Sequence, residues 1–197
     1  MKNLIENVVS TAIEAGEKIL TYYDNSDFKL KDDESPLTQA DIEANKIIES
    51  RLKSFSNYNI LSEEGSKISW ETRRKWQSYW IVDPLDGTKE FLKKNDEFTV
   101  NIALIEKNIP KLGVIYIPAL KTLYYGQKGY GSFKHVFKNN NKKINFFNDT
   151  NRIFCKSEIK DLKFVASRSH PSKELDNWLS NFGKYQLTDA GSSLKFC

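Results

Sequence analysis

The sequence contains little that would indicate a secreted, membrane-spanning or thiolate-metal protein. Its only cysteines, Cys155 and Cys197, lack the spacing of a metal site, so we expect free thiols in a reducing compartment. No apolar run is long enough to cross a bilayer. The N-terminus is no signal peptide, because Glu6, Glu14 and Glu17 interrupt its apolar stretch. These absences predict a cytoplasmic protein with no membrane span; peripheral association with the inner membrane is left open.

The composition predicts a folded globular protein. Lysine and arginine total 30 against 26 acidic residues, and this mild, evenly spread excess does not indicate a nucleic-acid partner. Hydrophobic residues make up 39% and aromatic residues 13%, which excludes disorder. A length of 197 residues without an internal repeat suits one large domain or two small ones.

The first half of the chain predicts two helices followed by a sheet. Apolar residues from Leu4 to Tyr23 recur at helical spacing. A second helix begins after Pro36 and runs to about Ser54, with Thr38 and Asp41 as a capping box. Strands are expected at "YNILSEEG", "SYWIVD", "EFTVNIALIE", "KLGVIYIP" and "TLYYGQKGYGSF". Their short links predict an antiparallel sheet.

The pattern changes after the polar stretch "FKNNNKKINFFNDTN", which we interpret as a loop near a domain boundary. The segments "LKFVASRS", "HPSKELDNWLSNFG" and "KYQLTDA" predict a strand, a helix and a strand, which is a parallel βαβ unit. We therefore expect an α+β domain at 1–134 with the antiparallel sheet and the metal-binding acids. A partial α/β domain at 135–197 is expected on the substrate side.

Acidic residues stand where several of these elements end: Asp41, Glu63, Glu64, Asp83 and Asp86. If these ends converge, several carboxylates share one cleft, and each raises the pKa of the others unless a cation neutralises them. Hard divalent ions with oxygen ligands do this, and Mg²⁺ is the default. The sequence therefore predicts a magnesium site among these acids.

The turn in "WIVDPLDGTKEF" suits both a metal and a phosphate. Pro84 has no N–H, so the carbonyl of Leu85 is free to face a metal, and Gly87 lets the backbone approach a ligand. Gly87 and Thr88 would offer amides at a helix start, where anions bind. Each feature also has a simpler interpretation. Asp-Pro-x-Asp-Gly is a good turn sequence, Asp41 is a capping residue, and "SEEG" is a solvated strand end.

Several motifs resemble those of a known enzyme family: "SPLTQAD", "LSEE", "YWIVDPLDGTKEF", "EFTVNIALI", "ASRSH" and "GSSLKFC". Together they resemble the CysQ-type 3′(2′),5′-bisphosphate nucleotidases of the Mg²⁺-dependent, lithium-sensitive inositol monophosphatase superfamily. The resemblance runs from the first helix to the last residue, apart from the Asn/Lys-rich loop. It implies the layered αβαβα sandwich of that superfamily, two or three Mg²⁺ ions and lithium inhibition.

The resemblance also implies roles for individual residues. Glu63, Asp83, Asp86 and the Leu85 carbonyl would bind metal, while Asp41 and Thr88 would orient and deprotonate the nucleophilic water. Substrate contacts would come from the metal-binding residues Glu63, Leu85 and Asp86, from the Gly87 and Thr88 amides, and from His170, Ser192 and Lys195. Simpler interpretations remain for the last three, as the residue after a strand, a helix cap and a solvated lysine respectively.

One departure from the family pattern affects the expected activity. The family continues past "GSSLKFC" to a further metal-binding Asp, so we expect a C-terminally incomplete sandwich. The leading hypothesis is hydrolysis of 3′-phosphoadenosine 5′-phosphate to AMP and phosphate by metal-activated water. The alternatives are an inositol or sugar phosphate phosphatase on the same scaffold, or an inactive truncated fragment that binds metal or nucleotide. The expected partner is a small nucleotide; a homodimer is left open.

Overall fold

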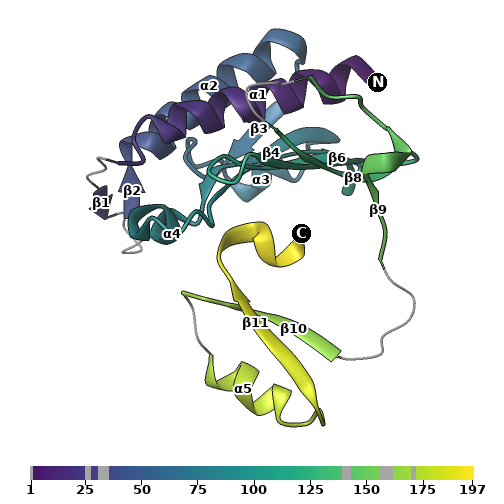
Figure 1. The fold of residues 1–197 in the computed structure, drawn as a ribbon. Coiled ribbons are helices and arrows are strands. Elements are labelled where there is room, and N and C mark those ends of the chain that lie inside the picture. The colour runs from purple at the N-terminus through teal and green to yellow at the C-terminus, as the bar shows by residue number, and fades with distance from the viewer. Residues whose placement is uncertain (1, 25–27, 31–35, 139–142, 156–161, 170–171) are drawn as a thin grey trace.

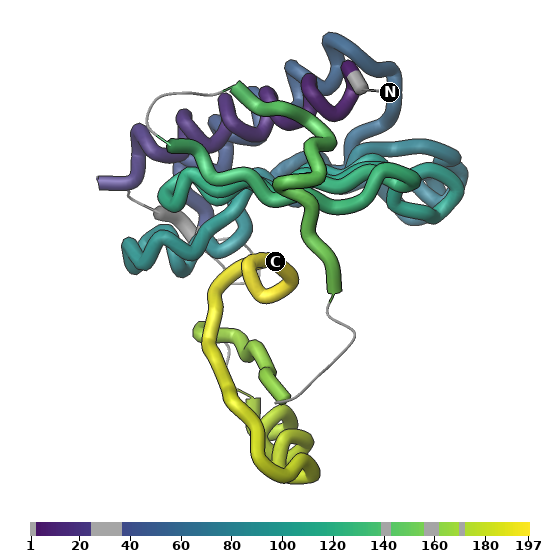
Figure 2. Tube along the Cα trace, turned by 45° about the vertical axis from the view of Figure 1, so that its right-hand side comes forward, coloured from purple at the N-terminus to yellow at the C-terminus, as the bar shows by residue number. Residues whose placement is uncertain are grey.

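The computed structural model describes residues 2–24, 28–30, 36–138, 143–155, 162–169 and 172–197 (Figure 1). Two long helices cover one face of a seven-stranded sheet, and a small unit of two strands and a helix lies beyond the other face. In a second view the C-terminal turn again lies against the sheet face opposite the helices (Figure 2). The order of layers agrees with the sandwich predicted from the sequence.

The two helices form as predicted. Helix α1 spans Lys2–Leu20 and helix α2 spans Gln39–Phe55. A short two-stranded sheet, β1 (Phe28–Leu30) and β2 (Pro36–Thr38), lies between them in the chain. Thr38 and Asp41 make the predicted capping box, in which each side chain bonds the other residue's backbone N–H. Asp41 is thereby fixed in the first turn of α2, with only 1% of its surface exposed.

The large sheet has the strand order β3-β4-β5-β6-β7-β8-β9. Its strands are β3 (Asn59–Ser62), β4 (Ser78–Asp86), β5 (Thr99–Glu106), β6 (Ile109–Ile117), β7 (Thr122–Gln127), β8 (Gly131–Val136) and β9 (Arg152–Ile153). Neighbouring strands are antiparallel from β4 to β9, as predicted. Strands β3 and β4 are parallel instead.

The parallel pair departs from the antiparallel sheet that we predicted throughout. Two parallel neighbours need a crossover connection, because the chain must return to the same end of the sheet before the second strand begins. Residues 63–77 make that connection and include the short helix α3 (Trp70–Arg73). As a result the C-terminal end of β3, which Glu63 directly follows, lies beside the C-terminal half of β4.

The main core lies between the two helices and the sheet. Apolar residues at helical spacing on α1 and α2 are fully buried: Ile5, Val8, Ala12, Ala15, Ile19, Ala44, Ile48 and Leu52. They face alternate residues of the strands, among them the fully buried Trp80 of β4. The Trp80 indole N–H donates a hydrogen bond to Ser56 Oγ at 2.7 Å, so this core group is paired. This packing fixes β4, the strand that ends in the two aspartates.

The C-terminal unit is the predicted parallel βαβ unit. It consists of β10 (Leu162–Ser167), α5 (Lys173–Leu179) and β11 (Tyr185–Ala190). Phe164, Trp178 and Phe182 form its aromatic cluster. After β11 the chain ends in a 3-10 turn, η2 (Ser192–Phe196), and another 3-10 turn, η1 (Asp149–Asn151), precedes β9. The division after residue 134 stays a prediction; β9, beyond that point, pairs with β8.

No described helix is long and apolar enough to cross a membrane.

Candidate active site

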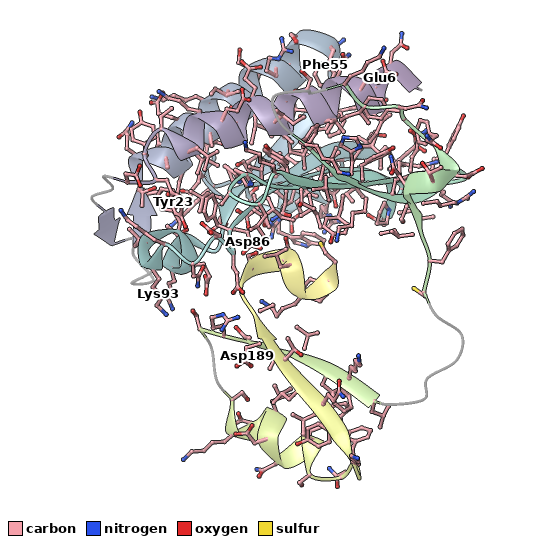
Figure 3. The ribbon with its side chains drawn as sticks, in the orientation of Figure 1. Glu6, Tyr23, Phe55, Asp86, Lys93 and Asp189 are labelled. Atoms are coloured by element: carbon pink, nitrogen blue, oxygen red, sulfur yellow. The ribbon has the colours of Figure 1, made fainter. Side chains whose placement is uncertain are left out.

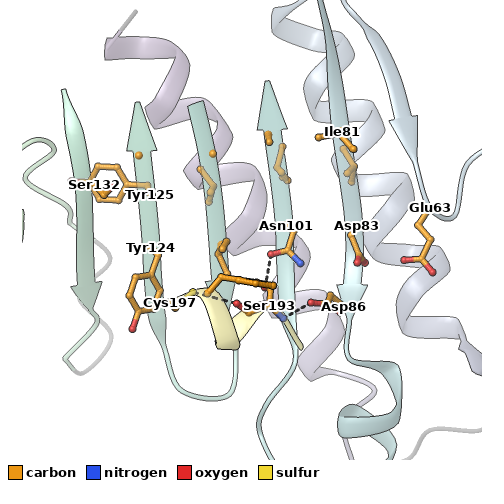
Figure 4. Close-up of a pocket in the computed structure, with 18 of the residues that line it drawn as sticks. Glu63, Ile81, Asp83, Asp86, Asn101, Tyr124, Tyr125, Ser132, Ser193 and Cys197 are labelled. Atoms are coloured by element: carbon orange, nitrogen blue, oxygen red, sulfur yellow. Dashed lines mark hydrogen bonds between the residues drawn. The ribbon is translucent and has the colours of Figure 1, made fainter. Parts of the chain in front are cut away.

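The predicted acids converge at the C-terminal end of β4. Figure 4 shows Glu63, Asp83 and Asp86 side by side on the sheet face that turns away from α1 and α2. Glu63 is held next to β4 because its backbone N–H donates to Val82 O at 3.0 Å. The acid that follows β3 and the two acids at the end of β4 thus lie together, as the sequence predicted.

A break in the β4 register shapes this end of the strand. Asp83 lies opposite Asn101 of β5, and Asp86 lies opposite Thr99, so the pairing shifts between the two aspartates. Pro84, which has no N–H to donate, lies inside the break. Gly87 follows with a φ of 89°, a left-handed conformation that favours glycine, and helix α4 (Thr88–Lys93) begins directly after it.

Thr88 connects the turn to helix α2. Its Oγ1 lies 3.2 Å from Asp41 Oδ1 and 3.3 Å from the carbonyl oxygen of Leu85. A hydroxyl has one proton to donate and also accepts, so Thr88 is placed to pass a proton to the Asp41 carboxylate. Burial raises the pKa of Asp41, and the hydrogen bonds from Thr38 and Thr88 lower it in part. The pair expected from the family pattern is therefore in hydrogen-bonding contact.

Asp83 carries the largest perturbation among the acids. Burial, the charges of Glu63 and Asp86 and a hydrogen bond with Glu63 raise the pKa of Asp83 to about 8. Its Oδ1 is buried and has no hydrogen-bond partner. A buried acceptor without a donor is costly, and at neutral pH this carboxyl keeps its proton unless a positive charge comes close.

Asp86 is the acid that the C-terminal turn contacts. Ser193 N–H donates to Asp86 Oδ2 at 2.5 Å, and Figure 3 shows Asp86 on the sheet face that turns toward this segment. Burial raises the pKa of Asp86, while the Ser193 amide and the charge of Lys195 lower it. Lys195 Nζ donates to the carbonyl oxygen of Ser192 at 2.6 Å, which holds its charge near Asp86.

The acids line one end of a cleft of about 930 Å³ on the open face of the sheet. The polar end holds Glu63, Asp83, Asp86, Asn101 and Ser193. The rest of the lining is mostly apolar or small, with Ile81, Ala103, Gly113, Ile115 and Tyr124, and it also includes Arg73. A cleft of this size accommodates a small charged molecule with an apolar or aromatic part.

The donor set fits a hard divalent cation in type and in charge. All the groups offered are oxygens, and the carbonyl of Leu85 lies within the same turn. The unpartnered Asp83 oxygen and the raised pKa of its carboxyl both favour a positive charge at this position. Across the residues with described placement, however, no three His, Cys, Asp or Glu side chains already form a metal-binding group.

The remaining predicted residues are placed in part. Gly87, Ser192 and Lys195 lie around Asp86, and Ser192 is buried with a left-handed φ of 48°. His170 lies outside the described residues. Residues that we did not predict also belong to the site: Ser193, and its partners Thr99 and Asn101. The signal was available, because "TVN" places two polar residues on one face of an otherwise apolar strand.

Comparison with known proteins is consistent across sequence and structure. The profile of the inositol monophosphatase family matches residues 1–195. The 3′(2′),5′-bisphosphate nucleotidase CysQ of Salmonella typhimurium is 41% identical over 201 residues, which cover 98% of this chain and 75% of that protein. That of Escherichia coli K12 is 39% identical with the same coverage. The crystal structure of CysQ from Bacteroides thetaiotaomicron superimposes with a TM-score of 0.84 at 38% identity, over 100% of this chain and 76% of that chain.

Proposed function

The chain belongs to the inositol monophosphatase family, and from its similarity to the CysQ nucleotidases we propose that it is a phosphomonoesterase that hydrolyses 3′-phosphoadenosine 5′-phosphate to AMP and phosphate. The observation that carries this proposal is the group of Glu63, Asp83 and Asp86 beside the Asp41–Thr88 pair. Phosphate monoesters hydrolyse extremely slowly in water, so charge must be concentrated at the reacting group.

We assign the metal-binding role to Glu63, Asp83, Asp86 and the carbonyl of Leu85. The group that fits them is Mg²⁺, which when bound supplies positive charge that activates water and neutralises the phosphate oxygens. The resemblance to the family suggests two or three ions and inhibition by lithium. Asp83 is the residue whose protonation state depends most on the cation, because its own surroundings hold its pKa near 8.

The other residues of the site would act on the attacking water or on the substrate. Thr88 would accept the proton of the attacking water as it passes its own proton to Asp41, over the 3.2 Å contact between them. The amides of Gly87 and Thr88 would hold the phosphate at the start of α4, and Ser192 and Lys195 would contact the nucleotide. His170 keeps a nucleotide-binding role as a prediction, as do the cytoplasmic location and a homodimer.

Phosphate release from several substrates tests the proposal. The purified chain is given 3′-phosphoadenosine 5′-phosphate or inositol monophosphate, with MgCl2 or with EDTA. We expect Mg²⁺-dependent release from the bisphosphate, at least tenfold faster than from inositol monophosphate, and loss of turnover in Asp41→Asn.

A preference for inositol monophosphate would reject the substrate assignment and favour the inositol phosphatase alternative. Release in EDTA at the same rate would reject the metal assignment. No turnover of either substrate would reject phosphatase activity for this chain.

A further inference from the structure

The carboxylate of Glu97 joins the C-terminal unit to the large sheet. It accepts two hydrogen bonds from Arg168, from Nε and Nη2, each at 2.8 Å. It also accepts the backbone N–H of Gly191 at 2.8 Å. Arg168 follows β10 and Gly191 follows β11, so one side chain holds the chain where both strands of that unit end. Bidentate arginine–carboxylate pairs fix orientation as well as distance.

Gly191 leads directly into the turn that contacts the acids. We call residues 191–195 the anchored turn. Ser193 donates its N–H to Asp86, and its Oγ lies 2.8 Å from Thr99 Oγ1 and 2.9 Å from Asn101 Oδ1. Ser192 takes a φ of 48°, which is unfavourable for a residue with a side chain. Such a conformation persists only where surrounding contacts hold it.

The residues beside Glu97 are held by Tyr23, which follows helix α1. Tyr23 Oη donates to Asp96 Oδ1 at 2.8 Å and accepts the Asp96 N–H at 3.0 Å. The Tyr23 ring packs against Phe91 and Phe98, with centroids 5.3 and 4.9 Å away. A continuous set of contacts therefore runs from the end of α1 through Glu97 to the anchored turn. Glu97 is a fixed support, because residues on both sides of it are packed.

We propose that Glu97, oriented by Arg168, is a positioning residue that sets the anchored turn against Asp86. The turn brings an amide and the ammonium of Lys195 to Asp86, one of the proposed metal-binding acids. Both groups would meet an anionic substrate bound at these acids, and this link to turnover rests on the proposed function. The geometric part, that Glu97 holds the turn, stands without it.

Hydrogen–deuterium exchange of Glu97→Gln tests the geometric part. Glutamine keeps the size of the side chain but offers one acceptor oxygen and no charge to three donors. We expect amide exchange in 191–196 to become about tenfold faster, which corresponds to about 1.4 kcal/mol, while peptides from β5, β6 and β10 stay as in the wild type. Arg168→Lys keeps a positive charge without the paired geometry, so its effect should be smaller.

Glu106→Gln is the matched control. It removes a carboxylate paired with Lys111 at the opposite end of β5, where both side chains are about 40% exposed. This variant should leave exchange in 191–196 unchanged. Unchanged exchange in Glu97→Gln would overturn the proposal, and so would an equal increase across β10 and β11, which would identify Glu97 as a tether of the whole unit.

Steady-state kinetics tests the link to turnover. Glu97→Gln should raise KM for 3′-phosphoadenosine 5′-phosphate about tenfold and leave kcat within threefold, and Glu97→Asp should restore part of the loss. An unchanged KM, or a fall in kcat alone, would refute the positioning role in catalysis. If the wild-type chain releases no phosphate, the proposed function fails, and the exchange experiment still decides whether Glu97 positions the turn.

Discussion

Replacing Asp83 by asparagine should remove the pH dependence of stability that this carboxyl creates. The surroundings of Asp83 raise the pKa of its carboxyl from the ordinary 3.8 to about 8. Between these values the folded chain keeps the Asp83 proton and the unfolded chain releases it. The folded state then binds more protons, so the free energy of unfolding falls as pH rises through this window. Above pH 8 the contribution is fully lost.

The size of the effect follows from the shift. A change of one pKa unit is worth about 1.4 kcal/mol, so the free energy of unfolding should fall by on the order of 5 kcal/mol between pH 4 and pH 8. Asparagine has nearly the same shape and carries no charge at any pH. The free energy of unfolding of Asp83→Asn, minus that of the wild type, should therefore grow with pH across this window. Groups remote from Asp83 titrate alike in both proteins and cancel in the difference.

Urea denaturation in EDTA, followed by tryptophan fluorescence at pH 4, 6 and 8, measures this difference. Glu106→Gln serves as the control for removing an exposed carboxylate. Adding MgCl2 at pH 8 should stabilise the wild type by about 2.7 kcal/mol at one hundred times the dissociation constant, and should stabilise Asp83→Asn far less. Turnover should be lost in that variant. If the difference in unfolding free energy between Asp83→Asn and the wild type changes by less than about 1 kcal/mol from pH 4 to pH 8, the reasoning about Asp83 is refuted.

Three further predictions concern single contacts. Thr88→Val removes the hydroxyl that lies 3.2 Å from Asp41, so kcat should fall by about 10²–10⁴ with little change in KM, whereas equal kcat values would remove Thr88 from the proton path. Gly191→Ala places a Cβ 2.5 Å from Cγ of the buried Glu90, so the urea midpoint should fall by the equivalent of about 1–3 kcal/mol. An unchanged midpoint would mean that the backbone or the Glu90 side chain moves to make room for the methyl group. Ile48→Ala empties a fully buried site between α2 and the sheet and should cost about 2–5 kcal/mol, measured in the same assay with activity per folded molecule unchanged.

The sequence predicted those parts of the site that local patterns encode. The capping box places Asp41 within four residues of its partner, and the end of an apolar strand places Asp83 and Asp86. The βαβ unit was also predictable, because its alternation of strand and helix lies within one continuous segment. In each case the determining residues are neighbours in the chain.

The rest depends on contacts between distant residues. Ser193 reaches Asp86 across 107 positions, and Arg168 reaches Glu97 across 71. Nothing in the residues next to either partner specifies such a pairing, because it arises only when the C-terminal unit folds back below the sheet. The parallel pairing of β3 with β4 has the same origin, since it depends on the path of the connection rather than on either strand.

The register shift in β4 allows two carboxylates of one strand, Asp83 and Asp86, to line the same cleft. Side chains alternate along a regular strand, so residues an odd number of positions apart point to opposite sides. Asp83 and Asp86 are three apart, yet both line the same cleft, because the pairing with β5 slips between them. In a regular strand with the same spacing of three residues, the two carboxylates would point to opposite faces of the sheet. The spacing of three residues and the register shift are therefore both needed to place the two carboxylates in one cleft.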